Sequence, residues 1–486
     1  MSLKQKTISG ILWSSVERFS VQGIQFVFQI IMARLLFPSD FGLVGMLVIF
    51  LAISQSFVDS GFSNALIRKQ NRTEVDFSTV FYFNIVVGIF FYFLLFFASP
   101  YIAMFYNAQV LENLTKVVAI NVFINSLTIV QRAKLTILVD FKTQAKASLW
   151  SVVISGAIGI WLAHRGFGVW ALAAQSVIAG FINMIALWIF SHWIPQWVFS
   201  KSSFKEMFSF GSKLLLSGLI DTTYNNIYIV VIGKYYSQID LGYYTKANNF
   251  TQFPSSNITG ILRRVTFPVL SSLQDDDEKL KEAYRKFLRL SAFIIFPLMM
   301  GLLGIASPLI QMLLTEKWKG AILLLQILCL SGMWFPIHAI NLNLLQVKGR
   351  SDLFLRLEII KKIIGVFILC ITIPMGVVGM CCGLVVSSFV ALFINTYYTG
   401  KLIQLGYWKQ MKDLLPILGN SLSMGIIVWG ISRLIHVNIL ALVIGITVGT
   451  IYYFSIARMT RSKELQEVKS LLDTQKIKNR LWIIRK

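Results

Sequence analysis

Apolar residues gather into long segments that recur along nearly the whole chain, with only short polar stretches between them. The segment from Val80 to Ala98 is a clear example, because aliphatic and aromatic side chains fill it around Asn84 and Gly88. The hydrocarbon core of a bilayer is about 30 Å thick, so a helix that crosses it needs about 20 mostly apolar residues. Backbone amides in hydrocarbon must be hydrogen-bonded within their own segment, and each such segment is therefore expected to be a helix.

These segments predict an all-α polytopic membrane protein with about 14 transmembrane helices. The spans are expected at residues 8–34, 40–66, 78–99, 110–131, 147–164, 168–191, 209–232, 241–262, 288–312, 320–345, 354–373, 376–400, 414–434 and 437–457. Spans of this length fill most of the 486 residues and leave no room for a separate catalytic domain. We therefore expect a protein that is not an enzyme.

A short sequence recurs at a spacing of 200 residues. Residues 33–42 align with residues 233–242, so that a cation, an aspartate and a glycine fall in register. The predicted first and seventh spans start on the same side of the membrane, which makes the repeats parallel. Parallel repeats are typical of transporters, in which the substrate site lies between the two halves.

The repeat predicts two pseudo-symmetric six-helix lobes followed by two extra C-terminal helices. We expect an N-terminal lobe with spans one to six at 1–205, a C-terminal lobe with spans seven to twelve at 206–402, two additional spans at 403–458, and a cytoplasmic amphipathic tail at 459–486. The polar stretch from Ser271 to Arg289 opens with four acidic residues, which suits the first turn of a helix. It predicts a short cytoplasmic helix that leads into the ninth span.

The net charge of +23 would suggest nucleic acid as the partner of a soluble protein. Here the cations follow the predicted topology instead. If the N-terminus is cytoplasmic, an even number of spans that cross the membrane in alternating directions places both termini inside. The inner loops and helix ends then carry about 35 of the 45 Lys and Arg residues. The outer loops carry about eight. The basic excess therefore indicates orientation and contact with anionic membrane lipids, and no nucleic acid.

The sequence contains no pattern typical of metal or nucleotide binding. Its four cysteines all lie in apolar segments and lack the spacing of metal ligands. Neither a phosphate-binding loop, nor a dinucleotide fingerprint, nor a paired-histidine zinc motif is present. We expect no metal and no cofactor, so this chain does not power transport by hydrolysing ATP. Coupling to H+ or Na+ remains open.

Polar side chains inside the spans recur at i, i+4 and i+7, which places them on single helical faces. Polar groups are costly in hydrocarbon and usually face a cavity or a neighbouring helix. The substrate-binding candidates are Arg18, Gln22, Gln25 and Gln29 on the first span, Asn121 and Asn125 on the fourth, Lys213, Tyr224, Asn225 and Tyr228 on the seventh, and Asn248 and Gln252 on the eighth. The stripes either line a hydrated cavity, with the first and seventh facing each other across a central cleft, or hydrogen-bond helices together.

Three titratable residues within the spans, Asp221, Asp59 and His338, are candidates for ion coupling. An ionised carboxylate at such a position must be paired, hydrated or protonated. Asp221 is therefore either the fixed partner of a cation such as Lys213 or Arg18, or a proton or sodium site. His338 either titrates near neutral pH or holds its helix by hydrogen bonds. Arg18 either binds a phosphate group or pairs with a neighbouring carboxylate.

The stretch that runs from Ala33 through Asp40 and Gly42 to Met46 resembles the end of the first span and the start of the second in bacterial polysaccharide flippases of the Wzx type. These belong to the multidrug/oligosaccharidyl-lipid/polysaccharide exporter superfamily. Residues 57–67, 241–244 and 264–270 continue the likeness. The resemblance implies fourteen spans in two lobes, and alternating-access translocation of undecaprenyl-diphosphate-linked oligosaccharide across the bacterial inner membrane.

A flippase of this kind would supply O-antigen of lipopolysaccharide, capsule or exopolysaccharide, with a polysaccharide polymerase or glycosyltransferases as possible partners. Asn and Gln amides offer a donor and an acceptor together, which suits a hydroxyl-rich ligand. Two alternatives stay open. One is an ion-coupled multidrug or cation exporter of the same superfamily, and the other is a non-transporting membrane scaffold of a glycan-synthesis complex.

Overall fold

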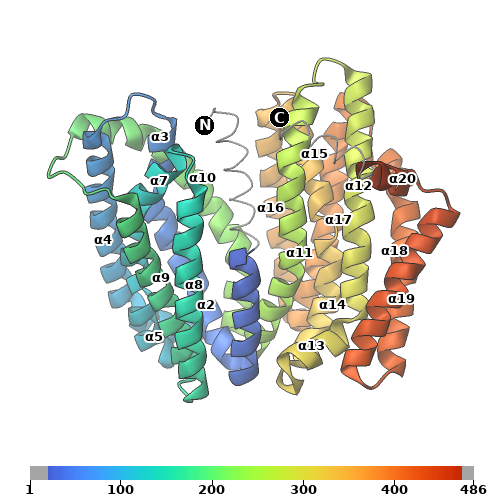
Figure 1. The fold of residues 1–486 in the computed structure, drawn as a ribbon, viewed down its shortest axis with the longest axis horizontal. Helices are drawn as coiled ribbons and strands as arrows, with labels where there is room; N and C mark the ends of the chain where they lie inside the picture. The colour runs from blue at the N-terminus through green and yellow to red at the C-terminus, as the bar shows by residue number, and fades with distance from the viewer. Residues whose placement is uncertain (1–19, 473–486) are drawn as a thin grey trace, which may run out of the picture. The chain divides into compact units, whose positions relative to one another are not determined.

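The computed structural model describes residues 20–472, and every regular element in that part of the chain is a helix (Figure 1). The backbone contacts divide the chain into two compact units, the first ending at Thr245 and the second starting at Lys246. Each unit is described by itself.

The first unit contains a helix at residues 20–35, then α2 (Pro38–Asp59), α3 (Phe62–Arg68), α4 (Glu74–Tyr106), α5 (Val110–Val118), α6 (Ile120–Ser126), α7 (Ile129–Ile137), α8 (Phe141–His164), α9 (Val169–Ser191) and α10 (Lys201–Tyr235). Helix α11 (Gln238–Ser271) crosses the boundary. The second unit continues with α12 (Asp277–Gly304), α13 (Ala306–Leu314), the 3-10 turn η1 (Glu316–Trp318), α14 (Gly320–Gly332), α15 (Phe335–Val347), α16 (Ser351–Thr372), the 3-10 turn η2 (Ile373–Met375), α17 (Gly376–Ile403), α18 (Tyr407–Leu434), α19 (Asn438–Met459) and α20 (Lys463–Leu472).

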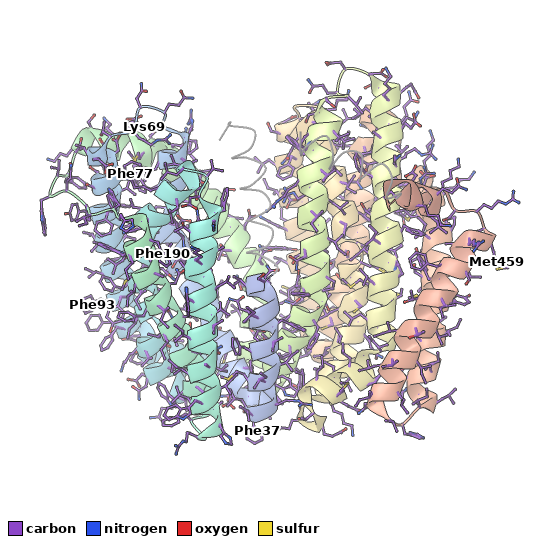
Figure 2. The ribbon with its side chains drawn as sticks, viewed as in Figure 1. Phe37, Lys69, Phe77, Phe93, Phe190 and Met459 are labelled. Atoms are coloured by element: carbon purple, nitrogen blue, oxygen red, sulfur yellow. The ribbon has the colours of Figure 1, made fainter. Side chains whose placement is uncertain are left out.

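Helix α4 shows that the outside of the first unit is apolar. Large side chains three or four residues apart form one exposed face of this helix, namely Val86, Phe90, Phe93, Phe97, Tyr101 and Met104. Figure 2 shows Phe93 projecting from α4 away from the neighbouring helices. The opposite face buries Asn84, Gly88 and Ser99. A helix in a water-soluble protein has the reverse arrangement, so this pattern indicates that α4 is surrounded by lipid.

Eleven helical segments of the described residues are long and apolar enough to cross a membrane. One of them, Ser351–Ile403, comprises α16 and α17, which pack against each other on either side of the turn η2. Helix α11 and the helix at residues 20–35 are not among the eleven. The predicted all-helical membrane fold is confirmed, whereas the count of fourteen spans stays a prediction.

Several predicted spans are interrupted in the structure. Span 40–66 breaks between α2 and α3, where Ser60 (φ 43°) and Gly61 (φ 69°) adopt left-handed backbone conformations. A Cβ on Gly61 would lie 2.9 Å from the carbonyl oxygen of Gly211 on α10, so the break allows α10 to approach closely. Span 110–131 is similarly divided into α5, α6 and the first residues of α7.

The polar stretch from Ser271 to Arg289 is helical from Asp277 onward and leads directly into the apolar residues of the same helix. Asp276 caps α12 by accepting the backbone N–H of Lys279 at 3.1 Å, and the helix then continues without interruption to Gly304. Because no helix-breaking residue separates the polar turns from the apolar ones, a single long helix forms.

The repeated sequence has a structural counterpart within the first unit. A Cβ on Gly42 would lie 1.9 Å from the carbonyl oxygen of Gln238, and a Cβ on Gly242 would lie 2.0 Å from that of Pro38. The two contacts correspond to each other, because Gly242 and Gln238 lie 200 residues after Gly42 and Pro38. The starts of α2 and α11 therefore cross at a distance that only glycine permits, which explains the residue type at both positions.

Helix α10, which the sequence assigned to the second lobe, packs against α2, α3 and α4 in the first unit. The lobe boundaries expected from the repeat stay a prediction.

Within the second unit, ion pairs connect α12 to α18 and to the described part of the predicted tail. On α12, Arg285 donates two hydrogen bonds to Asp413 of α18, at 2.6 and 2.7 Å. Further along α12, Lys286 and Arg289 pair with glutamates of α20 at 3.3 and 3.5 Å. The tail thus begins as a helix docked on α12, while residues 473–486 lie outside the described part.

Candidate functional site

Two of the larger cavities in the described part of the chain carry polar and charged side chains, and both lie within the first unit. By contrast, a cavity of about 560 Å³ between α12, α18 and α19 in the second unit is lined almost entirely by apolar residues. A ligand with hydroxyl or phosphate groups needs hydrogen-bonding partners, because burying them unpaired is unfavourable. The polar cavities are therefore the candidates.

The cavity that we call the polar cavity has a volume of about 520 Å³ and holds three of the substrate-binding candidates, Gln25, Asn121 and Asn125. Its volume falls within the range of about 300–1,000 Å³ that is usual for small-molecule sites. The other polar side chains of its lining are Gln55, Arg132, Ser148, Ser151, Ser176 and Asn183. Helices that are far apart in sequence thus contribute amides, hydroxyls and one guanidinium group to a single cavity.

Hydrogen bonds between helices hold the polar lining in place. Asn125 on α6 donates to the side-chain oxygen of Gln55 on α2 at 3.2 Å. One turn earlier, Asn121 donates to the hydroxyl of Ser176 on α9 at 2.9 Å. Each asparagine therefore joins two helices and also lines the cavity.

Helix α9 approaches α6 closely at Gly180. A Cβ there would lie 2.5 Å from the side-chain oxygen of Asn121, so a larger residue would displace this amide. Nearby, Ser151 on α8 donates to the carbonyl oxygen of Ala179 at 2.6 Å, which ties α8 to the same part of α9. Small residues on α8 and α9 therefore let three helices meet around the asparagines.

The break between α6 and α7 also contributes to the cavity. Trp188 donates its ring N–H to the carbonyl oxygen of Leu127 at 2.9 Å, which satisfies an acceptor that the interrupted helix leaves free. Arg132 follows on α7 and lines the cavity. Its positive charge interacts electrostatically with the carboxyl group of Asp59, which lies one helical turn after Gln55 on α2. The cavity thus combines neutral hydrogen-bonding groups with one cation that has an acidic neighbour.

The remaining candidates of the first unit lie elsewhere. Gln22 is half-buried and Gln29 is exposed on the first described helix. On α10, Asp221 and Asn225 are exposed, Tyr224 is half-buried and Tyr228 is buried. Lys213 lines a different cavity, together with Arg68 and Lys69. Among the described residues, the lining of the polar cavity includes none from α10. Arg18 lies outside the described part.

The candidates of the second unit occupy hydrogen-bonded or partly buried positions. Asn248 and Gln252 are half-buried on α11. The two ring nitrogens of His338 lie 3.1 Å from the hydroxyl of Ser388 and 3.3 Å from the amide nitrogen of Asn395. This geometry fits a histidine that links α15 to α17, while its role in ion coupling stays a prediction.

The candidate set from the sequence did not include the serines of α8 and α9 or Asn183. Arg132 and Gln55 continue polar stripes that are visible in the sequence, so their spacing could have identified them. Ser148, Ser151 and Ser176 stand among small and apolar residues, where serine commonly serves helix packing. Only the packing of α8 and α9 around α6 identifies them as part of the lining.

Comparison with solved structures agrees with the helical fold. The chain is similar to a lipid II flippase, MurJ, in an inward closed conformation, with a TM-score of 0.74 and 14% identity over 93% of this chain and 99% of that chain. It is also similar to an inward-facing multidrug resistance MATE family transporter of the MOP superfamily, with a TM-score of 0.63 and 16% identity over 82% of this chain and 100% of that chain. At these identities the likeness establishes the fold alone.

Two sequence relatives carry names from teichuronic acid and lipopolysaccharide biosynthesis. The teichuronic acid biosynthesis protein TuaB of Bacillus subtilis (strain 168) is 27% identical over 72% of this chain and 73% of its own length. The lipopolysaccharide biosynthesis protein WzxC of Escherichia coli (strain K12) is 25% identical over 87% of this chain and 83% of its own length. The model of a polysaccharide biosynthesis protein family matches residues 31–323, more than half of the chain. The chain therefore belongs to this family of polysaccharide biosynthesis proteins.

Proposed function

We propose that this chain is a flippase that translocates polyprenyl-diphosphate-linked oligosaccharide, by alternating access, for the biosynthesis of a cell-surface polysaccharide. The observation that carries the proposal is the polar cavity, in which amides and hydroxyls surround a single guanidinium group within a lipid-embedded helical unit. The family and the flippase-like fold support the same function.

The lining matches the two polar parts of such a substrate. Sugars carry many hydroxyl groups, each both donor and acceptor, and the amides of Asn121, Asn125 and Gln55 offer both functions. A diphosphate carries charge that hydrocarbon does not tolerate, and the planar donor fork of Arg132 can pair with it. A cavity of about 520 Å³ would hold part of an oligosaccharide at a time.

In this proposal Asp59 interacts electrostatically with Arg132 while the cavity is empty. The arriving diphosphate would compete with the carboxylate for the guanidinium, and Asp59 would recover it after release. Arg18 is proposed as a second cation for the diphosphate, and H+ or Na+ as the coupling ion through Asp221 or Asp59.

The proposed location is the bacterial inner membrane, with both termini in the cytoplasm. The distribution of Lys and Arg along the chain supports this orientation, because inner loops are usually the basic ones. Polymerases or glycosyltransferases of the same polysaccharide are the proposed protein partners.

Transport by reconstituted protein tests the proposal. A fluorescently labelled polyprenyl-diphosphate oligosaccharide is placed in proteoliposomes, and its transfer between leaflets is followed by a membrane-impermeant quencher. We expect Arg132→Gln to slow transfer by at least tenfold, while Arg165→Gln, at the C-terminal end of α8 outside the polar cavity, transfers at the wild-type rate.

A multidrug exporter would give a different result. Efflux of a cationic dye by the wild type, with no transfer of the lipid-linked oligosaccharide, would contradict the proposal and favour the exporter. Absence of both activities in a folded protein would favour the scaffold.

A further inference from the structure

The second polar cavity of the first unit lies where α3 ends and α10 begins. We call it the basic pocket; its volume is about 630 Å³ and its lining includes Arg68, Lys69, Glu206, Phe210 and Lys213. Arg68 ends one candidate membrane span, and the next begins after a short turn at Glu74. The pocket therefore lies at the level where spans reach the membrane surface, and the proposed function does not use it.

The charge of the basic pocket is unbalanced toward cations. Its lining contains three cations and one carboxylate, Glu206. Glu206 pairs with Lys69 at 3.0 Å, and within the described part of the chain neither Arg68 nor Lys213 forms an ion pair. Two positive charges thus face the same cavity without a carboxylate of their own.

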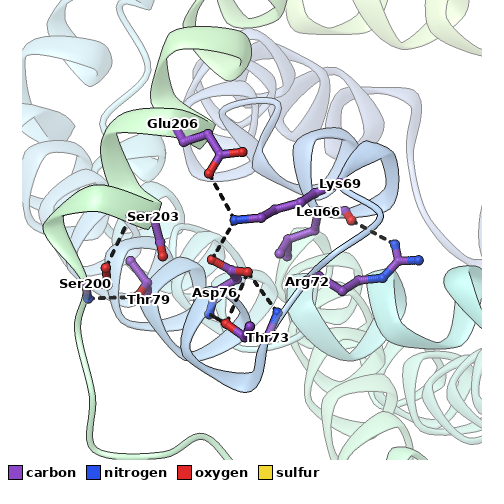
Figure 3. A network of polar contacts seen from close by, with 9 residues as sticks. All are labelled: Leu66, Lys69, Arg72, Thr73, Asp76, Thr79, Ser200, Ser203 and Glu206. Atoms are coloured by element: carbon purple, nitrogen blue, oxygen red, sulfur yellow. Dashed lines mark hydrogen bonds and ion pairs between the residues drawn. The ribbon is translucent and has the colours of Figure 1, made fainter.

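Neighbouring contacts hold two cations of the lining, Arg68 and Lys69, in place. The guanidinium of Arg68 lies 4.7 Å from the ring centre of Phe210, within the distance of a cation–π contact. Figure 3 shows Lys69 between Glu206 and Asp76, with Asp76 in turn held by Thr73 at the start of α4. The hydrogen bond to Glu206 is the main influence that raises the pKa of Lys69 above its ordinary value of 10.5, so this lysine stays charged at neutral pH.

Exposed apolar side chains occur on the same two helices, next to the lining of the pocket in sequence. Ile67 on α3 and Phe208 and Leu214 on α10 are all more than a third exposed. A water-soluble anion needs only the cations, whereas a lipid also needs apolar surface for its chains. The combination of cations and exposed apolar residues where spans end is typical of sites for anionic lipid headgroups.

We propose that the basic pocket binds the phosphate group of a membrane lipid through Arg68 and Lys213. The phosphate lies between α3 and α10, with the acyl or prenyl chains along Phe208 and Leu214. An anionic phospholipid and the diphosphate of a prenyl carrier share this chemistry, and the experiment distinguishes the two sources. The inference does not depend on transport, because it concerns binding at a pocket separate from the polar cavity.

Lipid binding to the purified full chain in a neutral detergent tests the inference. Binding is measured by native mass spectrometry with phosphatidylglycerol, phosphatidylcholine and farnesyl diphosphate as the probes. A cation near a membrane surface contributes about fivefold to the binding of an anionic lipid. We therefore expect Arg68→Gln with Lys213→Gln to weaken binding of an anionic probe about 25-fold relative to phosphatidylcholine.

Two further variants separate a built pocket from general surface charge. Lys205→Gln removes an exposed cation from α10 outside the pocket, and we expect no change in binding. Glu206→Gln removes the only carboxylate of the described lining, and we expect about fivefold tighter binding. A purely structural role of Glu206 would not give this opposite sign.

The three probes assign the source. A loss confined to phosphatidylglycerol assigns the pocket to phospholipid, a loss confined to farnesyl diphosphate assigns it to the carrier lipid, and a loss of both assigns it to the shared phosphate. Wild-type binding by the double variant, or an equal loss in Lys205→Gln, would overturn the inference. Farnesyl diphosphate binding that is lost only in Arg132→Gln belongs to the polar cavity and would count against the carrier lipid as the occupant of the basic pocket.

Discussion

The crossing of the two repeated segments makes a strong prediction about Gly42. In Gly42→Ala the new methyl group would lie 1.9 Å from the carbonyl oxygen of Gln238, far inside van der Waals contact. Both atoms belong to, or are fixed by, helical backbone, so no side-chain rotation relieves the overlap. The starts of α2 and α11 must therefore move apart by more than 1 Å.

The magnitude follows from two opposing contributions. Overpacking of a close-packed interior costs about 1–3 kcal/mol, and we take the upper end because the contact is with backbone. Replacing glycine by alanine inside a helix stabilises it by about 1 kcal/mol. The net destabilisation expected for Gly42→Ala is thus about 2 kcal/mol, or about a 30-fold change in the folding equilibrium.

Thermal unfolding of the purified protein in detergent measures this effect. The matched control is Gly218→Ala on α10, where nothing lies within 4 Å of the new methyl group. We expect this control to be as stable as the wild type or more so. Gly242→Ala should be destabilised as much as Gly42→Ala. The double variant should lose less stability than the two single variants together, because one displacement of the helices relieves both contacts. Equal stability of Gly42→Ala and the Gly218→Ala control would refute the reasoning.

Further predictions concern the ion pairs, the polar cavity, the coupling ion and the orientation. Lys69→Met should destabilise the first unit by about 2 kcal/mol because it leaves the buried Asp76 without its cation, whereas loss of the exposed Glu206 should cost less than about 0.5 kcal/mol. Since the pKa of Lys69 is raised, its contribution to stability is complete below pH 10.5 and lost only above it. The difference in unfolding free energy between Lys69→Met and wild type, measured by chemical unfolding, should therefore stay constant from about pH 6 to about pH 9. A fall within that range would contradict the pairing. Asn125→Ala should weaken binding of the oligosaccharide about fivefold in a titration with the labelled substrate, and unchanged binding would exclude the amide from the site. Asp221→Asn should give slower transport that still responds to an imposed ion gradient if the residue is a fixed charge partner, or abolish the gradient response if it is the coupling site; wild-type behaviour would rule out both roles. A single cysteine at position 70, in a background without the native cysteines, should resist an impermeant thiol reagent in intact spheroplasts, and labelling there would contradict the proposed orientation.

The sequence predicts the helical membrane fold well because membrane helices depend on local composition. Every apolar segment must satisfy its own backbone, so its length and hydropathy suffice to identify it. The breaks within these segments were not predicted, because Ser60 and Gly61, or Leu127 and Thr128, do not stand out from ordinary helical residues. Their conformations depend on the approach of α10 and on the hydrogen bond from Trp188.

The candidate site was predicted in part. The 3.6-residue period places Asn121 and Asn125 on one face, and in the structure both line the same cavity. The period does not identify which helix the face meets. It therefore could not show that Gln25 joins this cavity while Lys213 lines the basic pocket. Contacts between helices distant in sequence decide that, and they are set by small residues such as Gly180.

The central claim is that the polar cavity binds the headgroup of a lipid-linked oligosaccharide. Photocrosslinking tests it most directly: a polyprenyl-diphosphate oligosaccharide with a photoreactive group on its first sugar is bound to the purified protein, irradiated, and mapped by mass spectrometry. The account predicts labelled peptides from α6, α7 and α9, at residues 121–132 and 176–183, and loss of that labelling when unlabelled substrate is added in excess. Specific labelling confined to other parts of the chain, with the α6, α7 and α9 peptides recovered unmodified, would contradict it.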